Sequence, residues 1–81
     1  MKNSNKSRLL KIMSIIFNES NKKLNENISM LNYEKWDSLK NLNLLLALEE
    51  EFKIKFSSIQ TTKMLDFKSV LKYINKNTKK K

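Results

Sequence analysis

Residues 36–52 read WDSLKNLNLLLALEEEF, and this stretch predicts the central helix of the fold. Asp37 can accept a hydrogen bond from a free backbone amide of the first helical turn. We therefore expect the helix to open at Asp37 or Ser38 and to run to about Phe52.

The apolar side of this helix is wide, because its six leucines and Phe52 cover well over half of its circumference. Such a helix either contacts several neighbours or exposes part of its apolar side to a partner. Leu39 and Leu46 border the polar side, so we expect these two leucines to be exposed. The polar side itself is formed by Lys40, Asn43, Glu50 and Glu51.

A first helix is predicted from about Lys6 to Asn18. Its apolar residues recur at positions i, i+3, i+4, i+7 and i+8, which places them on one side of a helix. These residues are Leu9, Ile12, Met13, Ile16 and Phe17. The polar residues 19–32 that follow predict a long loop, held by a few apolar anchors at Leu24, Ile28, Met30 and Leu31.

Two helix starts are predicted after residue 52. Ser57 and Gln60 have the spacing of a capping box, which indicates a short third helix to about Met64. Asp66 can cap a last helix, in which the apolar residues again recur at helical spacing. These are Phe67, Val70, Leu71 and Ile74. The alternating residues 53–56 are too few to build a sheet.

The predicted fold is an all-α four-helix bundle with three longer helices and one short one. With 81 residues and no internal repeat, we expect a single domain over residues 1–81. The ends of the chain, residues 1–5 and 78–81, are polar and basic, and we expect both to fray.

The composition disfavours an enzyme. The chain has no Cys and no His, so it lacks a thiolate nucleophile, the common general base and the usual ligands of a zinc site. We expect no catalytic residue and no metal. The longest apolar run, residues 44–48, is far too short to span a membrane, and no signal peptide is visible. We expect a cytoplasmic protein.

The net charge of +9 is unevenly distributed along the chain. Residues 34–51 carry −3, so the remaining residues carry +12, much of it at the two ends. One interpretation is drift at solvated surface positions in a composition rich in Lys, Asn and Ile. The other is a basic surface with a real partner.

Two motifs in the central stretch resemble the acyl carrier protein family. They are Trp36-Asp37-Ser38-Leu39 at the predicted helix start and ALEEEF at residues 47–52. The resemblance extends without a gap over residues 30–74. It implies that Ser38, flanked by Asp37 and Leu39, is the attachment site of 4′-phosphopantetheine derived from coenzyme A.

The resemblance also implies a function and partners. The chain would hold an acyl or aminoacyl group as a thioester on the phosphopantetheine arm and present it to other enzymes. Expected partners are a phosphopantetheinyl transferase and an acyl-loading ligase, acyltransferase or synthase. We expect the carrier itself to be a monomer. The docking surface carried over from the family consists of Leu39, Leu42, Leu46, Glu49 and Glu50.

Some residues depart from the family pattern. Lys35 stands where the family has Gly, and Lys40 and Asn43 occupy positions that are often acidic. Trp36 resembles variants found in freestanding carriers of specialised pathways, but it could equally be a core residue beneath the loop. Together with the basic charge, these departures argue against service to the general fatty-acid synthase.

Two other functions stay open from the sequence. A small basic helical protein could bind nucleic acid, although its lysines are spread over both ends, and we expect no nucleic-acid partner. A carrier-like interaction module could keep Ser38 unmodified. For Ser38 alone, a role in capping the helix is also possible.

Overall fold

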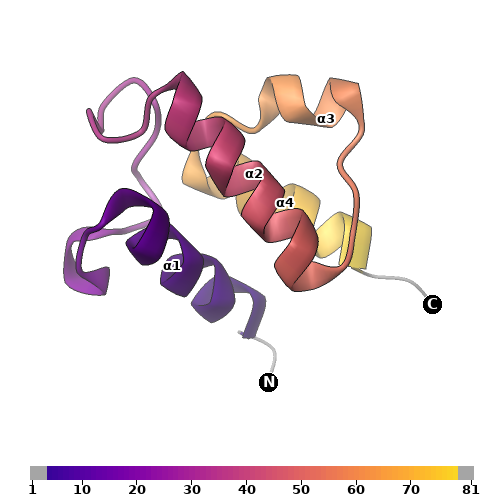
Figure 1. Cartoon of the computed structure of the whole chain (residues 1–81), viewed down its shortest axis with the longest axis horizontal. Coiled ribbons are helices and arrows are strands. Elements are labelled where there is room, and N and C mark those ends of the chain that lie inside the picture. The colour runs from indigo at the N-terminus through magenta and orange to yellow at the C-terminus, as the bar shows by residue number, and fades with distance from the viewer. Residues whose placement is uncertain (1–3, 79–81) are drawn as a thin grey trace.

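Four α-helices form the fold, α1 (Ser4–Phe17), α2 (Ser38–Phe52), α3 (Ser58–Lys63) and α4 (Phe67–Thr78), and a 3₁₀ helix, η1 (Asn21–Lys23), lies between the first two (Figure 1). This computed structural model describes residues 4–78. Within them the only β-type pairing is an isolated antiparallel bridge between Ser29 and Asp66. The predicted all-α bundle of three longer helices and one short one is confirmed.

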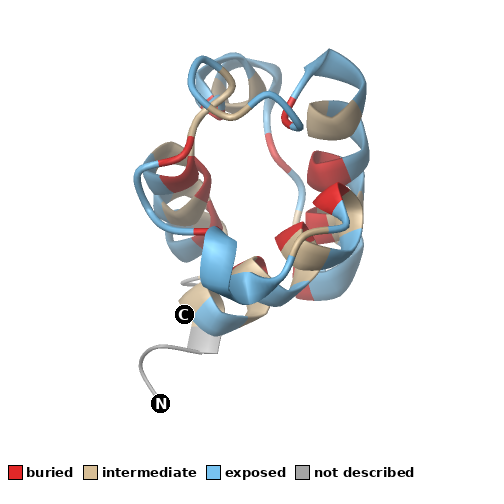
Figure 2. Cartoon of the chain, turned by 90° about the vertical axis from the view of Figure 1, so that its left-hand side faces the viewer, coloured by how far each residue is buried: buried red, intermediate tan, exposed pale blue. Residues whose placement is uncertain are grey.

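The helices surround a single apolar core. Helix α1 contacts both α2 and α4, and α3 contacts α4. In Figure 1 α2 lies nearest to the viewer and α4 lies behind it. Figure 2, turned by 90°, shows these two helices on opposite sides of the molecule, with their buried segments facing the interior.

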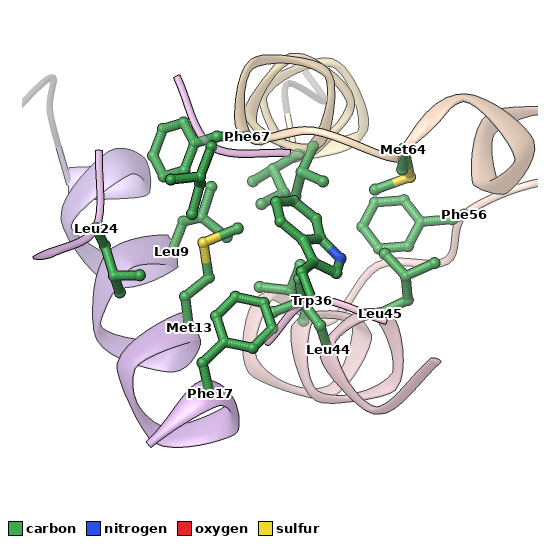
Figure 3. Packing of buried hydrophobic residues seen from close by; sticks show 14 of the residues in the cluster. Leu9, Met13, Phe17, Leu24, Trp36, Leu44, Leu45, Phe56, Met64 and Phe67 are labelled. Atoms are coloured by element: carbon green, nitrogen blue, oxygen red, sulfur yellow. The ribbon is translucent and has the colours of Figure 1, made fainter. Parts of the chain in front are cut away.

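The core is built from large apolar side chains of every long helix and of the loops between them (Figure 3). No polar or charged residue is buried within residues 4–78. The fully buried side chains are Leu9, Met13, Phe17, Trp36, Leu44, Leu48, Met64, Phe67, Val70 and Ile74.

Helix α1 follows the predicted apolar stripe. Leu9, Met13 and Phe17 are buried, while Ile12 and Ile16 are half-buried against the core. The helix ends at Phe17 because Asn18 adopts a left-handed conformation with φ of 54°, which Asn tolerates better than most residues.

The fraying of residues 1–5 and 78–81 stays a prediction, but helical structure reaches into both ranges. Ser4 and Asn5 belong to α1, which therefore begins before the predicted Lys6, and Thr78 ends α4. The amide Nδ2 of Asn5 donates to Asn75 Oδ1 at 2.8 Å and to Thr78 Oγ1 at 3.3 Å. These bonds join the first turn of α1 to the last turn of α4. Residues 1–3 and 79–81 lie outside the described residues.

The loop between α1 and α2 has three of its four predicted anchors. Leu24 and Ile28 are buried and Met30 is half-buried, but Leu31 is 97% exposed and the prediction for it is wrong. Backbone bonds from Met30 N to Leu65 O and from Phe67 N to Ile28 O hold this segment against the loop before α4. The turn around Ser29, whose hydroxyl accepts from Leu31 N, then directs Leu31 to the solvent.

Helix α2 ends at the predicted Phe52, and the starts of α3 and α4 have the predicted caps. Helix α2 ends where Lys53 becomes left-handed, with φ of 57°. Ser57 and Gln60 form the complete capping box of α3, and Asp66 Oδ1 accepts from Ser69 N at 2.7 Å at the start of α4. In α4, Phe67, Val70 and Ile74 are buried and Leu71 is half-buried.

The polar side of α2 differs from the prediction at one position. Asn43, Glu50 and Glu51 are exposed as expected, but Lys40 is half-buried. Its ammonium group donates to Ile16 O at 3.3 Å, because α1 lies close to this side of α2 and offers a free carbonyl near its end.

Trp36 is the largest buried side chain, with 1% of its surface exposed. Its ring packs beside Phe17 of α1, at 5.5 Å between ring centroids. The indole N–H donates to Asn41 Oδ1 at 2.9 Å, so its only polar atom is satisfied. Of the two interpretations of Trp36, the structure supports the core residue.

A polar network joins the end of α1 to the loop before α2. Glu19 forms an ion pair with Lys35 at 3.0 Å and accepts a hydrogen bond from the Tyr33 hydroxyl at 2.9 Å. The bond to Lys35, followed by that to Tyr33, lowers the pKa of Glu19. Burial, followed by the bond to Glu19, raises the pKa of Tyr33 from 10.0 to about 12.

The Trp36–Asn41 bond should contribute measurably to stability. Replacing Asn41 by Ala leaves a buried indole N–H without its partner, which costs about 1–3 kcal/mol. We expect Asn41→Ala to lower the free energy of unfolding by this amount in urea titrations followed by Trp fluorescence. The control Asn43→Ala, at an exposed position of the same helix, should change it by less than about 0.5 kcal/mol. Equal losses in both variants would contradict this role of Asn41.

The Tyr33 phenol should titrate well above its ordinary range. In a Tyr73→Phe background Tyr33 is the single tyrosine, so phenolate absorbance reports its pKa directly. We expect a pKa of about 12, and a decrease toward 10.0 on Glu19→Gln. Because the folded state favours the neutral phenol, this contribution to stability is complete below pH 10 and is lost as the pH rises through 12. A titration midpoint near 10 in both variants, with circular dichroism confirming that they are folded, would show that neither burial nor Glu19 raises the Tyr33 pKa.

Candidate functional site

Ser38 is the first residue of α2 and is exposed. The preceding residue, Asp37, caps the helix: its backbone is extended, and its Oδ1 accepts from Lys40 N at 2.9 Å. The cap therefore does not need the Ser38 hydroxyl, and the interpretation that Ser38 serves to cap the helix is wrong. The Ser38 side chain is exposed to solvent at the start of the helix.

The backbone on both sides of Ser38 is held in place. Trp36 N donates to Tyr33 O at 3.0 Å, and Asn41 N donates to Asp37 O at 2.8 Å. The buried Trp36 ring anchors the segment to the core two residues before Ser38. Ser38 is thus presented by a fixed helix end. Asn41 belongs to this support, and the sequence alone offered no signal for it.

The start of α2 suits a modest negative charge. The free amides of the first turn and the positive end of the helix dipole favour an anion there by about 0.3–1 kcal/mol. Asp37 already uses one of these amides and repels a second negative charge. An exposed phosphodiester on Ser38 fits this position, because solvent would screen it from the Asp37 carboxylate.

Three exposed leucines continue from Ser38 along one side of α2. Leu39, Leu42 and Leu46 are 64%, 55% and 56% exposed. At 3.6 residues per turn they form one stripe, and Glu50 extends it toward the end of the helix. The predicted exposure of Leu39 and Leu46 is confirmed, and Leu42 joins them. We name these four residues the leucine stripe.

The three acids at the end of α2 are not equivalent. Glu49 is half-buried, and its Oε2 accepts from Phe56 N at 2.8 Å, which fixes the chain after the helix. Glu51 pairs with Arg8 at 3.0 Å, and the Arg8 guanidinium lies 4.2 Å from the centroid of the Phe52 ring. Glu50 is exposed and takes part in none of these contacts. The sequence did not distinguish Glu49 from Glu50. The hydrogen-bond partner of Glu49, Phe56 N, lies in the turn after the helix, and the helical pattern does not reveal it.

Two features are absent from the part of the chain that the structure describes, a metal-binding cluster and a membrane-spanning helix. Within residues 4–78 no three acidic side chains lie close enough together to hold a metal ion. None of the helices in that range has the length and apolar character needed to cross a membrane.

Comparison with known proteins supports the resemblance. No protein-family model matches the chain. The chain is 35% identical over 78 residues to the acyl carrier protein of Buchnera aphidicola subsp. Schizaphis graminum, an alignment that covers 96% of this chain and 99% of that protein. This identity over nearly the whole of both chains, together with the four-helix fold, shows that the chain belongs to the acyl carrier protein family.

Proposed function

We propose that the protein carries acyl or aminoacyl groups on 4′-phosphopantetheine attached to Ser38. The observation that carries this proposal is the exposed Ser38 hydroxyl at a helix start whose cap is already supplied by Asp37. Membership of the acyl carrier protein family supports the choice of this hydroxyl as the attachment point. Ser38 Oγ would lose its proton and bond to the phosphorus of coenzyme A next to pantetheine, and the nucleotide would leave.

The residues around Ser38 support this role in distinct ways. When bound, the arm supplies a terminal thiol for a thioester, which the cysteine-free chain itself lacks. Asp37 orders the first turn of α2, and Trp36 ties that turn to the core. A new phosphodiester can therefore form without rearranging the bundle.

We propose that the leucine stripe is the surface on which partner enzymes dock. Its exposed leucines provide apolar contact area next to Ser38, and Glu50 supplies an uncommitted carboxylate. Glu49 is a weaker candidate than the family pattern implies, because its carboxylate is already bound to Phe56 N. The expected partners are a phosphopantetheinyl transferase and an acyl-loading ligase, acyltransferase or synthase.

We further propose that the protein is a cytoplasmic, monomeric carrier rather than an enzyme, with the chemistry done by its partners. The basic charge, together with Lys40 and Asn43 at positions that are often acidic, favours a specialised pathway over the general fatty-acid synthase. Trp36 no longer supports that choice, because its burial in the core explains its presence.

Modification of Ser38 is tested by intact mass after incubation with coenzyme A and a broad-specificity phosphopantetheinyl transferase. We expect one phosphopantetheine adduct, which is lost in Ser38→Ala. A matched control is Ser58→Ala, because Ser58 is likewise exposed and follows the capping residue of its helix. That variant should retain the adduct. An unchanged mass across several transferases would instead favour an unmodified interaction module.

Docking is tested by the rate of the same modification. Removing two adjacent leucines of the stripe with Leu42→Ala and Leu46→Ala should lower kcat/KM of the transferase by about tenfold or more, since central apolar contacts dominate interfaces. Leu31→Ala removes a more exposed leucine outside the stripe and should leave the rate unchanged. If all variants react equally fast, the stripe is not the docking surface for this partner.

A further inference from the structure

Helix α4 has a row of lysines on its outer side. Lys68, Lys72 and Lys76 follow one another at intervals of four residues, which places them along one side of the helix, and all three are exposed. The residues that α4 buries, Phe67, Val70 and Ile74, lie on the opposite side of the helical wheel. We name these three lysines the lysine row.

The positive charge of this region is not balanced by acids in the sequence. No acidic residue follows Asp66, so residues 67–81 carry +6 through the lysine row and the three terminal lysines. Lys68 borders a shallow depression that is also lined by two acidic residues, Glu26 and Asp66. Glu26 pairs with Lys6 at 3.6 Å, and Asp66 caps α4.

Helix stability does not account for the lysine row. Like charges four residues apart destabilise a helix slightly. The helix dipole favours Lys76 in the last turn but disfavours Lys68, which lies in the first turn. The row is therefore free to serve a partner outside the bundle.

We infer that the outer side of α4 is a contact surface for an anionic lipid membrane. Each basic residue held near a membrane surface is attracted to acidic lipid headgroups without entering the bilayer, and the attraction adds up along a row. The apolar side of α4 is used by the core, so the helix has no free apolar side to insert. Lipid adsorption fits better than nucleic-acid binding, because the row consists of Lys rather than Arg. The aromatic residue beside the row, Tyr73, is only half-exposed, and its ring is already contacted by Lys72, whose Nζ lies 5.5 Å from the ring centroid, so it offers bases little surface for stacking.

This surface would orient the carrier on the membrane. Helices α2 and α4 lie on opposite sides of the bundle (Figures 1 and 2). When the lysine row faces the lipid, Ser38 and the leucine stripe face away from it and stay open to partner enzymes. The inference rests on the charge and geometry of α4 alone, so its test does not depend on whether Ser38 is modified.

Vesicle sedimentation tests the inference with the full chain. We expect binding to phosphatidylcholine vesicles that contain 30 mol% phosphatidylglycerol, no binding to pure phosphatidylcholine, and a steep loss of binding as salt is raised. The combined variant Lys68→Gln, Lys72→Gln and Lys76→Gln should bind about 100-fold more weakly, at roughly fivefold for each lysine. A matched control, Lys11→Gln, Lys22→Gln and Lys23→Gln, removes the same charge from exposed positions on α1 and η1 and should retain most of the binding.

Three results would overturn the inference. The first is no binding to the anionic vesicles, and the second is equal loss in the two triple variants, which would mean that net charge alone acts. The third is displacement from the vesicles by an equal concentration of single-stranded DNA phosphate, which would assign the surface to nucleic acid.

The orientation has its own measurement, because the chain has no cysteine of its own. A dye attached to Ser69→Cys, which lies beside the lysine row on α4 and leaves its three lysines in place, should be quenched by lipids that carry a nitroxide headgroup. The same dye attached to Ser38→Cys should not be quenched. Equal quenching at both positions would contradict the proposed orientation.

Discussion

The burial of Trp36 is the constraint on which the rest of the site depends. The ring fills the core beside Phe17, and its N–H is held by Asn41 from the first turns of α2. A side chain of this size contributes several kcal/mol when it is buried, a large part of the stability of so small a domain. Because Asp37 and Ser38 follow directly, the interaction that stabilises the core also fixes the place and direction of the helix start.

Much of this arrangement could be predicted from the sequence, because it depends on local chemistry. The caps at Asp37, Ser57 and Asp66 act within three residues of the helix that they start, so their spacing alone identifies them. The apolar rows of α1 and α4 are likewise visible in the helical repeat. The exposure of Leu39 and Leu46 could be predicted because α2 has more apolar surface than its neighbours can cover.

The parts that could not be predicted depend on contacts between distant segments. Leu31 is apolar like the true anchors of the loop, but the backbone bond between Met30 and Leu65 decides which loop residues face inward. Helices α1 and α4 extend to Ser4 and Thr78, and a hydrogen bond between Asn5 and Thr78 joins them there. Glu49 looks like a free docking acid and Glu51 like a solvated one until the structure brings Phe56 and Arg8 to them. In each case the deciding partner lies at least seven residues away in the sequence.

The central claim is that Ser38 reacts on a helix start that is already in its final form. Amide and indole chemical shifts of the isotope-labelled protein, recorded before and after phosphopantetheine transfer, test it most directly. We expect shifts confined to the first turn of α2 and its neighbours, with the Trp36 indole resonance unchanged. Movement of that resonance together with those of buried core residues would contradict it, because the bundle would then rearrange to accept the group.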